Sequence, residues 1–201
     1  MVSHLYKFLV LVALISSSIL SPIAVAANSH EAKINRYIDS NIRNWVSSDE
    51  LLLAVDQQNI DHFNISSSEI NRLDQRWRKE KLRDGGSLIS SVMGNELSAF
   101  LRGIKAASGG VITEIFVMDN VGLNVGQTNG TGDLMQGDEA KWQKTYQVSA
   151  NAVFIDAVEE EDGINISQVS LTVARPNSAR LGAITIVLFS CSATKSSSSI
   201  A

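Results

Sequence analysis

The sequence predicts an α+β fold in which several helices precede an antiparallel sheet of about five strands. Up to Ala107, apolar residues recur at helical spacing, whereas from Val111 onward apolar and β-branched runs alternate with turn residues. The pair Gly109-Gly110 separates the two patterns. The 201 residues contain no internal repeat and no sign of a second domain, so we expect one domain.

Residues 1–26 have the features of a secretory signal peptide. His4 and Lys7 form a short basic segment, an apolar run follows from Phe8 to Ile15, and small residues stand at positions 24–26. The apolar run is shorter than the roughly 20 residues that cross a bilayer. Cleavage is therefore favoured over a retained anchor, and we expect a periplasmic or secreted protein.

The charge and cysteine content exclude several classes of protein. The formal net charge is −4, and removal of Lys7 with the leader makes it −5. A mildly acidic chain without a basic tail is a poor nucleic-acid binder. Cys191 is the only cysteine, which rules out an intrachain disulfide. We interpret it as a small buried hydrophobe rather than a nucleophile.

Four helices are expected before the sheet. The first covers 31–45 and the second is a short helix after Ser48, with Leu51, Leu52 and Val55 facing inward. Ser66 caps the third, whose mixed-sign charged face from Arg76 to Lys81 we expect to be solvated. The fourth covers 88–107, with a buried stripe of Leu97, Phe100, Leu101 and Ile104.

Five strands are expected after Gly110, at 111–119, 123–128, 152–158, 164–173 and 181–189. A loop at 130–137 and a short helix at 138–146 separate the second strand from the third. Asp162-Gly163 is typical of a tight turn. In the fourth strand the apolar positions change parity, which predicts a bulge near Ser167-Gln168. Residues 190–201 are expected to form a polar tail.

The sequence lacks the residues that common enzymes need. His30 and His62 are the only histidines after the leader, and we expect His62 on the surface or between helices. No GxSxG or HExxH motif and no dinucleotide-binding or phosphate-binding glycine loop is present. We therefore predict no catalytic residue, no metal and no cofactor. A calcium site or a glycosidase pair built from Asp133, Asp138 and Glu139 is a less favoured alternative.

The segment 115–146 carries the main functional signal. It gathers polar and aromatic side chains on a Gly-rich loop between strands. A small-molecule pocket combines a few polar groups with apolar and aromatic walls. We therefore expect a binding site here.

Three segments resemble the Cache family of PAS-like extracellular sensor domains. They are Ile115–Asp119 with Gly122, Thr131–Trp142, and the pair Gln168–Val173 and Leu181–Ile186. The resemblance covers about residues 31–189. It implies helices before a central antiparallel sheet, with a ligand between that sheet and the loops and short helix after the second strand.

Carried over by position, the resemblance implies a pocket formed by Asp133, Gln136, Trp142 and Tyr146. Trp142 and Tyr146 share one helix face at i and i+4, and the alternative is that they only anchor the helix to the sheet. Asp119 is expected to end the first strand and order its turn.

At the two positions after Asp133, the resemblance leads us to expect aromatic residues that help to form the pocket wall. This chain has Leu134 and Met135 there. The predicted function is a non-enzymatic periplasmic sensor that captures an amino acid, an amine or a short carboxylate. It would present this solute to a membrane receptor or kinase. The alternative is an interaction protein whose pocket Leu134 and Met135 have filled.

Overall fold

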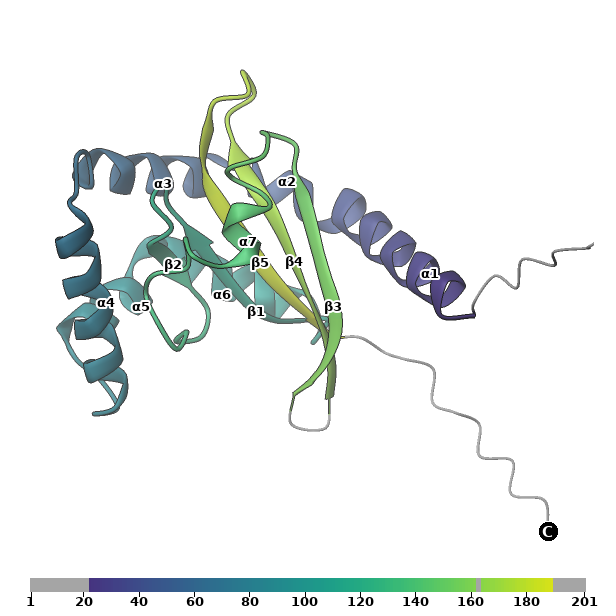
Figure 1. Ribbon diagram of the computed structural model, residues 1–201, viewed down its shortest axis with the longest axis horizontal. Coiled ribbons are helices and arrows are strands. Elements are labelled where there is room, and N and C mark those ends of the chain that lie inside the picture. The colour runs from purple at the N-terminus through teal and green to yellow at the C-terminus, as the bar shows by residue number, and fades with distance from the viewer. Residues whose placement is uncertain (1–21, 162–163, 190–201) are drawn as a thin grey trace, which may run out of the picture. The chain divides into compact units, whose positions relative to one another are not determined.

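The computed structural model describes residues 22–161 and 164–189 (Figure 1). The chain divides into two units, the first ending at Tyr37 and the second beginning at Ile38. The described part of the first unit is helix α1 (Pro22–Tyr37). Most of the predicted leader, the polar tail with Cys191, and the Asp162-Gly163 turn lie outside the described residues.

The second unit begins with six helical segments. They are η1 (Ile38–Ile42), α2 (Arg43–Val46), α3 (Asp49–Asp61), α4 (Ser67–Lys81), α5 (Ser87–Gly94) and α6 (Glu96–Ala107). The predicted helix at 88–107 is in fact two helices. Gly94 weakens the helix, and the Asn95 side chain accepts a hydrogen bond from Ser98 N at 2.8 Å, which starts a new one.

The sheet contains five strands in the order β2-β1-β5-β4-β3, and every neighbouring pair is antiparallel. The strands are β1 (Ile112–Met118), β2 (Asn124–Gln127), β3 (Val153–Glu161), β4 (Ile164–Ala174) and β5 (Arg180–Phe189). Helices followed by a five-stranded antiparallel sheet confirm the predicted α+β class and are consistent with a PAS-like arrangement.

The two faces of the sheet differ in chemistry. One face carries Ile115 opposite Ile186 and Val117 opposite Ile184, and all four side chains are fully buried. Helices α3 and α6 pack on this face. The other face places Phe116 opposite the buried Thr185, with polar residues beside them. The short helix α7 (Ala140–Gln143) lies over β4 and β5 on that side (Figure 1).

The predicted bulge occurs on a different strand. β4 pairs with β5 without interruption from Ile166 to Val173, so β4 itself is regular. The irregularity lies on β3, where the step from Ile155 to Val158 faces the shorter step from Val169 to Ser167. The parity change has another cause: both faces of β4 are covered, so apolar side chains occur on both.

Candidate functional site

A buried carboxylate ends β1 and shapes the turn that follows. The Asp119 side chain is fully buried. Its Oδ1 accepts hydrogen bonds from the backbone N–H of Val121 at 3.0 Å and of Leu123 at 2.9 Å. Its Oδ2 contacts Gln58 Nε2 at 2.9 Å and His62 Nδ1 at 2.8 Å. Asp119 therefore orders the turn as predicted, and His62 lies against it from the end of α3.

The turn also receives the returning loop. Gly122 has φ +88°, and a Cβ added to it would lie 2.3 Å from Gly137 Cα, so only glycine permits this approach. The backbone N–H of Gln136 donates to Gly122 O at 2.8 Å. This contact fixes Gln136, which is only 2% exposed.

Helix α4 holds the same loop from the other side. Asp74 Oδ1 accepts hydrogen bonds from the backbone N–H of Leu134 at 2.9 Å and of Met135 at 3.0 Å. Trp77 Nε1 donates to Thr131 O at 3.0 Å. Side chains of α4 thus hold the main chain of the loop in place without a ligand.

The charged face of α4 is only partly the solvated surface that we predicted. Arg78 pairs with Asp74 at 2.7 Å and with Asp133 at 3.0 Å. Lys81 Nζ donates to Gly130 O at 2.8 Å. Contacts made across more than 45 residues of sequence have no signature in local periodicity, so this role of α4 was missed.

The side chains of Leu134 and Met135 do not line the cavity described below. Leu134 is buried with Trp77, Val92 and Leu123, and Met135 packs against the same cluster. Both side chains stabilise the contact between the loop and the helices. The two side chains that the sequence suggested as an apolar plug therefore lie outside the cavity.

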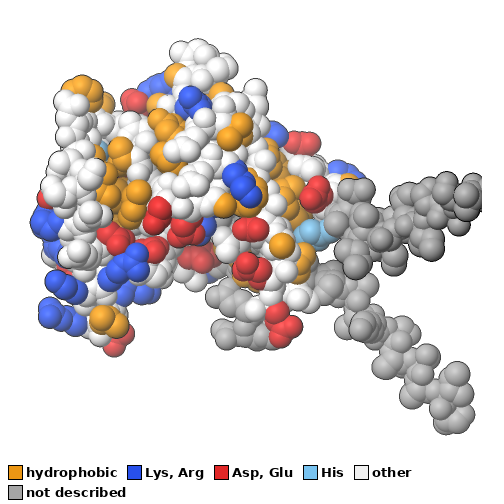
Figure 2. All heavy atoms as spheres, in the orientation of Figure 1, with side chains coloured by type: hydrophobic (Ala, Val, Ile, Leu, Met, Phe, Trp, Pro, Cys, Tyr) orange, Lys and Arg blue, Asp and Glu red, His pale blue; other side chains and the backbone are white. Residues whose placement is uncertain are grey.

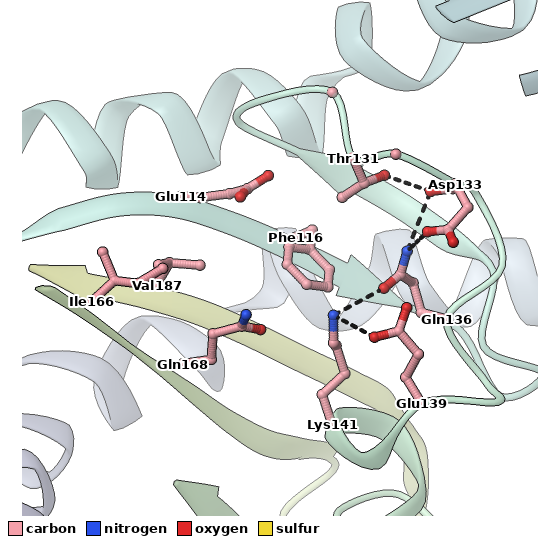
Figure 3. Close-up of a pocket in the computed structure, with 12 residues that line it drawn as sticks. Glu114, Phe116, Thr131, Asp133, Gln136, Glu139, Lys141, Ile166, Gln168 and Val187 are labelled. Atoms are coloured by element: carbon pink, nitrogen blue, oxygen red, sulfur yellow. Dashed lines mark hydrogen bonds and ion pairs between the residues drawn. The ribbon is translucent and has the colours of Figure 1, made fainter. Parts of the chain in front are cut away.

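A cavity of about 370 Å³ lies between the polar face of the sheet and this loop (Figure 3). Its lining residues come from three strands, the loop and the start of α7: Glu114, Phe116, Gly130, Thr131, Gly132, Asp133, Gln136, Glu139, Lys141, Ile166, Gln168 and Val187. The size is within the range of small-ligand sites. Seven of the twelve lining residues are polar or charged and three are apolar, so the lining is more polar than that of a typical small-ligand site.

A chain of polar contacts runs along one wall of the cavity (Figure 3). Lys141 Nζ contacts Glu139 Oε2 at 2.8 Å and Gln136 Oε1 at 3.3 Å. Gln136 Nε2 in turn donates to the Asp133 carboxylate. Thr131 Oγ1 donates to Asp133 O at 2.6 Å. The wall is therefore preorganised rather than formed by loose side chains.

The two carboxylates that Arg78 bridges have opposite pKa shifts. Burial raises the pKa of Asp133 above its ordinary value of 3.8, and the negative charge of Glu139 raises it further. Burial also acts to raise the pKa of Asp74, but hydrogen bonds from Met135 N–H and Arg78 outweigh it and lower that pKa. Asp133 thus lies where additional negative charge is unfavourable. Figure 2 shows acidic side chains gathered near the middle of the visible face, with a group of basic side chains beside them over α4.

The four predicted site residues fall into two groups. Asp133 and Gln136 line the cavity. Trp142 and Tyr146 are stacked on each other, with ring centroids 5.0 Å apart, and pack against Phe116, Met118 and Ala183. Trp142 Nε1 also donates to Asp119 O at 3.1 Å, which ties α7 to the β1 turn. Phe116 belongs to both groups, since it contacts this cluster and lines the cavity.

Several cavity residues were not predicted as site residues: Glu114, Phe116, Glu139, Lys141, Ile166, Gln168 and Val187. A signal for one of them was present. Glu114 is the only charged residue of β1, in a strand whose opposite face is the core, and a charged side chain at such a position can indicate a functional role.

Within residues 22–161 and 164–189, no group of three or more His, Cys, Asp or Glu side chains is arranged to hold a metal ion. No helix in these ranges is long and apolar enough to cross a membrane.

No protein-family model matches the sequence, and no curated protein matches it. Solved structures do show similarity. The sensor domain of the V. cholerae histidine kinase DctB is 14% identical with a TM-score of 0.36, over 83% of this chain and 57% of that one. The ligand-binding domain of the Pseudomonas aeruginosa PAO1 chemoreceptor PctC, in complex with GABA, is 12% identical with a TM-score of 0.38, over 57% and 54%.

The sensory domain of the Campylobacter jejuni chemoreceptor Tlp3, with isoleucine bound, is 13% identical with a TM-score of 0.36, over 85% of this chain and 64% of that one. This chain thus spans between about half and two thirds of the length of these three structures. The neighbours are sensor and ligand-binding domains of histidine kinases and chemoreceptors. With TM-scores below 0.5, the similarity assigns neither a family nor a ligand.

Proposed function

We propose that this protein is a non-enzymatic sensor or binding domain that captures a small organic solute. The observation that carries the proposal is the cavity of about 370 Å³ between the polar sheet face and the loop 130–136. Both Asp133 and Gln136 line it, and hydrogen bonds from α4 and from the β1 turn hold its wall.

The arrangement suits binding better than chemistry. Within the lining, the polar groups of the loop and of the start of α7 form a continuous hydrogen-bonded wall. Its apolar members are Phe116, Ile166 and Val187. A rigid wall lowers the entropy that binding must overcome. We infer that the captured solute belongs to the amino acids, amines or short carboxylates, and that the domain at 31–189 presents it to a membrane receptor or kinase after the leader is removed.

The first test is native mass spectrometry of the protein purified from the periplasm of its own cells, followed by denaturation. A small molecule released at one per chain supports the proposal. Binding of that molecule should also raise stability by about 2.7 kcal/mol at 100 times Kd. An empty protein, with no thermal shift in a screen of the three solute classes, contradicts it.

A matched pair of variants locates the binding. Gln168→Trp places a bulky ring in the cavity, so the variant should release no ligand. Gln57→Trp, on an exposed position of α3, should retain it. Equal ligand content in the two variants would place the ligand elsewhere.

The interaction role remains the second candidate, on a different observation. Exposed apolar side chains occur on and just after α3, where Leu53, Ile60 and Phe63 are 61–79% exposed. An exposed apolar stripe is typical of a protein contact. Loss of a partner from pull-down experiments with Ile60→Asp, while ligand content is unchanged, would support this role.

A further inference from the structure

Lys141 lies in a site that is built to hold an ammonium group. Its Nζ is 2.8 Å from Glu139 Oε2 and 3.3 Å from Gln136 Oε1. It also lies over the Phe116 ring, 5.1 Å from the ring centroid. The side chain is only 17% exposed. A carboxylate, an amide oxygen and an aromatic face thus surround one cation (Figure 3).

These three groups are the ones that recognise an alkylammonium ion. Carboxylate and amide oxygens accept hydrogen bonds from its N–H groups, and an aromatic face attracts its positive charge. Ile166 and Val187 line the same cavity, but each is only 6% exposed, so the apolar surface beside the ammonium position is small. The groups around Lys141 therefore suit the ammonium end of a small organic amine.

The ion pairs around the cavity also favour a cation as the ligand. Asp133 is paired with Arg78 at 3.0 Å, and Glu139 is paired with Lys141 at 2.8 Å. A ligand ammonium that takes the place of the Lys141 ammonium leaves Glu139 paired and the charge of the site unchanged. A carboxylate ligand would instead bring a second negative charge next to Glu139, which is unfavourable.

We propose that the ligand of this cavity is an organic ammonium ion and that Lys141 occupies the ammonium position until the ligand displaces it. The inference rests on the proposed function and specifies its ligand class. Lys141 is then an internal competitor. It keeps the carboxylate of Glu139 paired in the free protein and weakens binding of every amine by the free energy needed to release it.

The test uses two probes with the same five-carbon skeleton and opposite charge, 3-methylbutylamine and 3-methylbutanoate. Their dissociation constants are measured at constant ionic strength by NMR titration of the Gln136 side-chain amide and the Phe116 ring. The variants are Lys141→Met, which keeps an unbranched stem, and Lys144→Met. Lys144 is a matched control because it lies over Phe154, 4.2 Å from the ring centroid, and does not line the cavity.

We expect Lys141→Met to bind the amine about five- to thirty-fold more tightly than the wild type, the range that a weak ion pair and a cation–π contact provide. Lys144→Met should match the wild type. The double variant Lys141→Met/Glu139→Gln should bind the amine more weakly than Lys141→Met alone, because the carboxylate that accepts the ligand's N–H groups is lost. The carboxylate probe should bind weakly throughout.

Other results overturn the inference. If the wild type binds 3-methylbutanoate and Lys141→Met does not, Lys141 is an anchor for an anion, and the proposed binding function survives with a different ligand. If the amine affinity is the same with and without Lys141, there is no displacement. If neither probe binds any variant, the ammonium assignment fails. The mass spectrometry then decides separately whether the cavity binds a solute at all.

Discussion

Replacement of Asp119 by alanine is the sharpest test of how the β1 turn supports the site. The change removes the acceptor of the Val121 and Leu123 N–H groups. Leu123 is fully buried, so its N–H would lose a partner that water does not replace. A buried donor left unsatisfied costs about 1–3 kcal/mol. Two such donors, one of them partly exposed, together give a loss of roughly 2–5 kcal/mol.

The assay is thermal and urea unfolding of the wild type, Asp119→Ala and Asp138→Ala. The expected loss corresponds to a fall in Tm of roughly 5–20 °C for a domain of this size. Asp138 is exposed on the loop that returns to this turn, so its replacement should change stability by no more than about 0.5 kcal/mol. If Asp119→Ala and Asp138→Ala unfold at the same temperature and the same urea concentration, the hydrogen-bond reasoning is refuted. Asp119→Asn, which keeps one acceptor oxygen, should lie between the wild type and Asp119→Ala.

The remaining predictions concern the two carboxylates that Arg78 bridges, Asp74 and Asp133, and one close approach of strands. Asp133→Asn should raise Tm at pH 7, because a carboxyl whose folded pKa is raised costs stability above that pKa. The gain should vanish as the pH falls below the ordinary value of 3.8, and pH-dependent melting curves check both limits. Asp74→Asn should lower Tm at pH 7, since a carboxyl with a lowered folded pKa stabilises above 3.8, and this contribution disappears as the pH falls through the folded pKa. A Tm of Asp133→Asn at or below that of the wild type at pH 7 would contradict the first prediction, and a Tm of Asp74→Asn at or above it would contradict the second. Gly182→Ala should prevent correct pairing of β1 with β5, because the added Cβ would lie 2.0 Å from Met118 O. A soluble variant with wild-type melting and circular dichroism would disprove this close approach.

The fold class followed from local patterns, because each pattern reports on one element. Strands from β1 to β5 were placed near their observed limits by their β-branched runs and turn residues. The helix expected at 88–107 was wrong because its apolar stripe continues through Gly94, where the chain in fact ends one helix and caps the next with Asn95. The bulge was assigned to β4 because parity alone does not distinguish a bulged strand from one that is buried on both faces.

The candidate site was predicted less completely than the fold, because a cavity is a product of long-range contacts. Asp133 and Gln136 were found through the position of their loop, and both line the cavity. Arg78 donates a hydrogen bond to Asp133 from 55 residues away in the sequence, and no local sequence pattern indicates such a contact. The pairing of Lys141 with Glu139 was also not predicted. Glu139 was considered as a carboxylate of a less favoured calcium or glycosidase site, and Lys141 was given no role of its own. The role of Trp142 and Tyr146 in ligand binding stays a prediction.

The unequal faces of the sheet have a consequence for how this protein can change. The hydrocarbon side chains packed beneath α3 and α6 carry most of the driving force for folding. Positions such as Glu114 and Gln168, on the opposite face, contribute comparatively little to it. A lineage, or an engineer, can therefore exchange these positions to recognise a new solute while the scaffold stays folded, and selectivity can diverge faster than architecture.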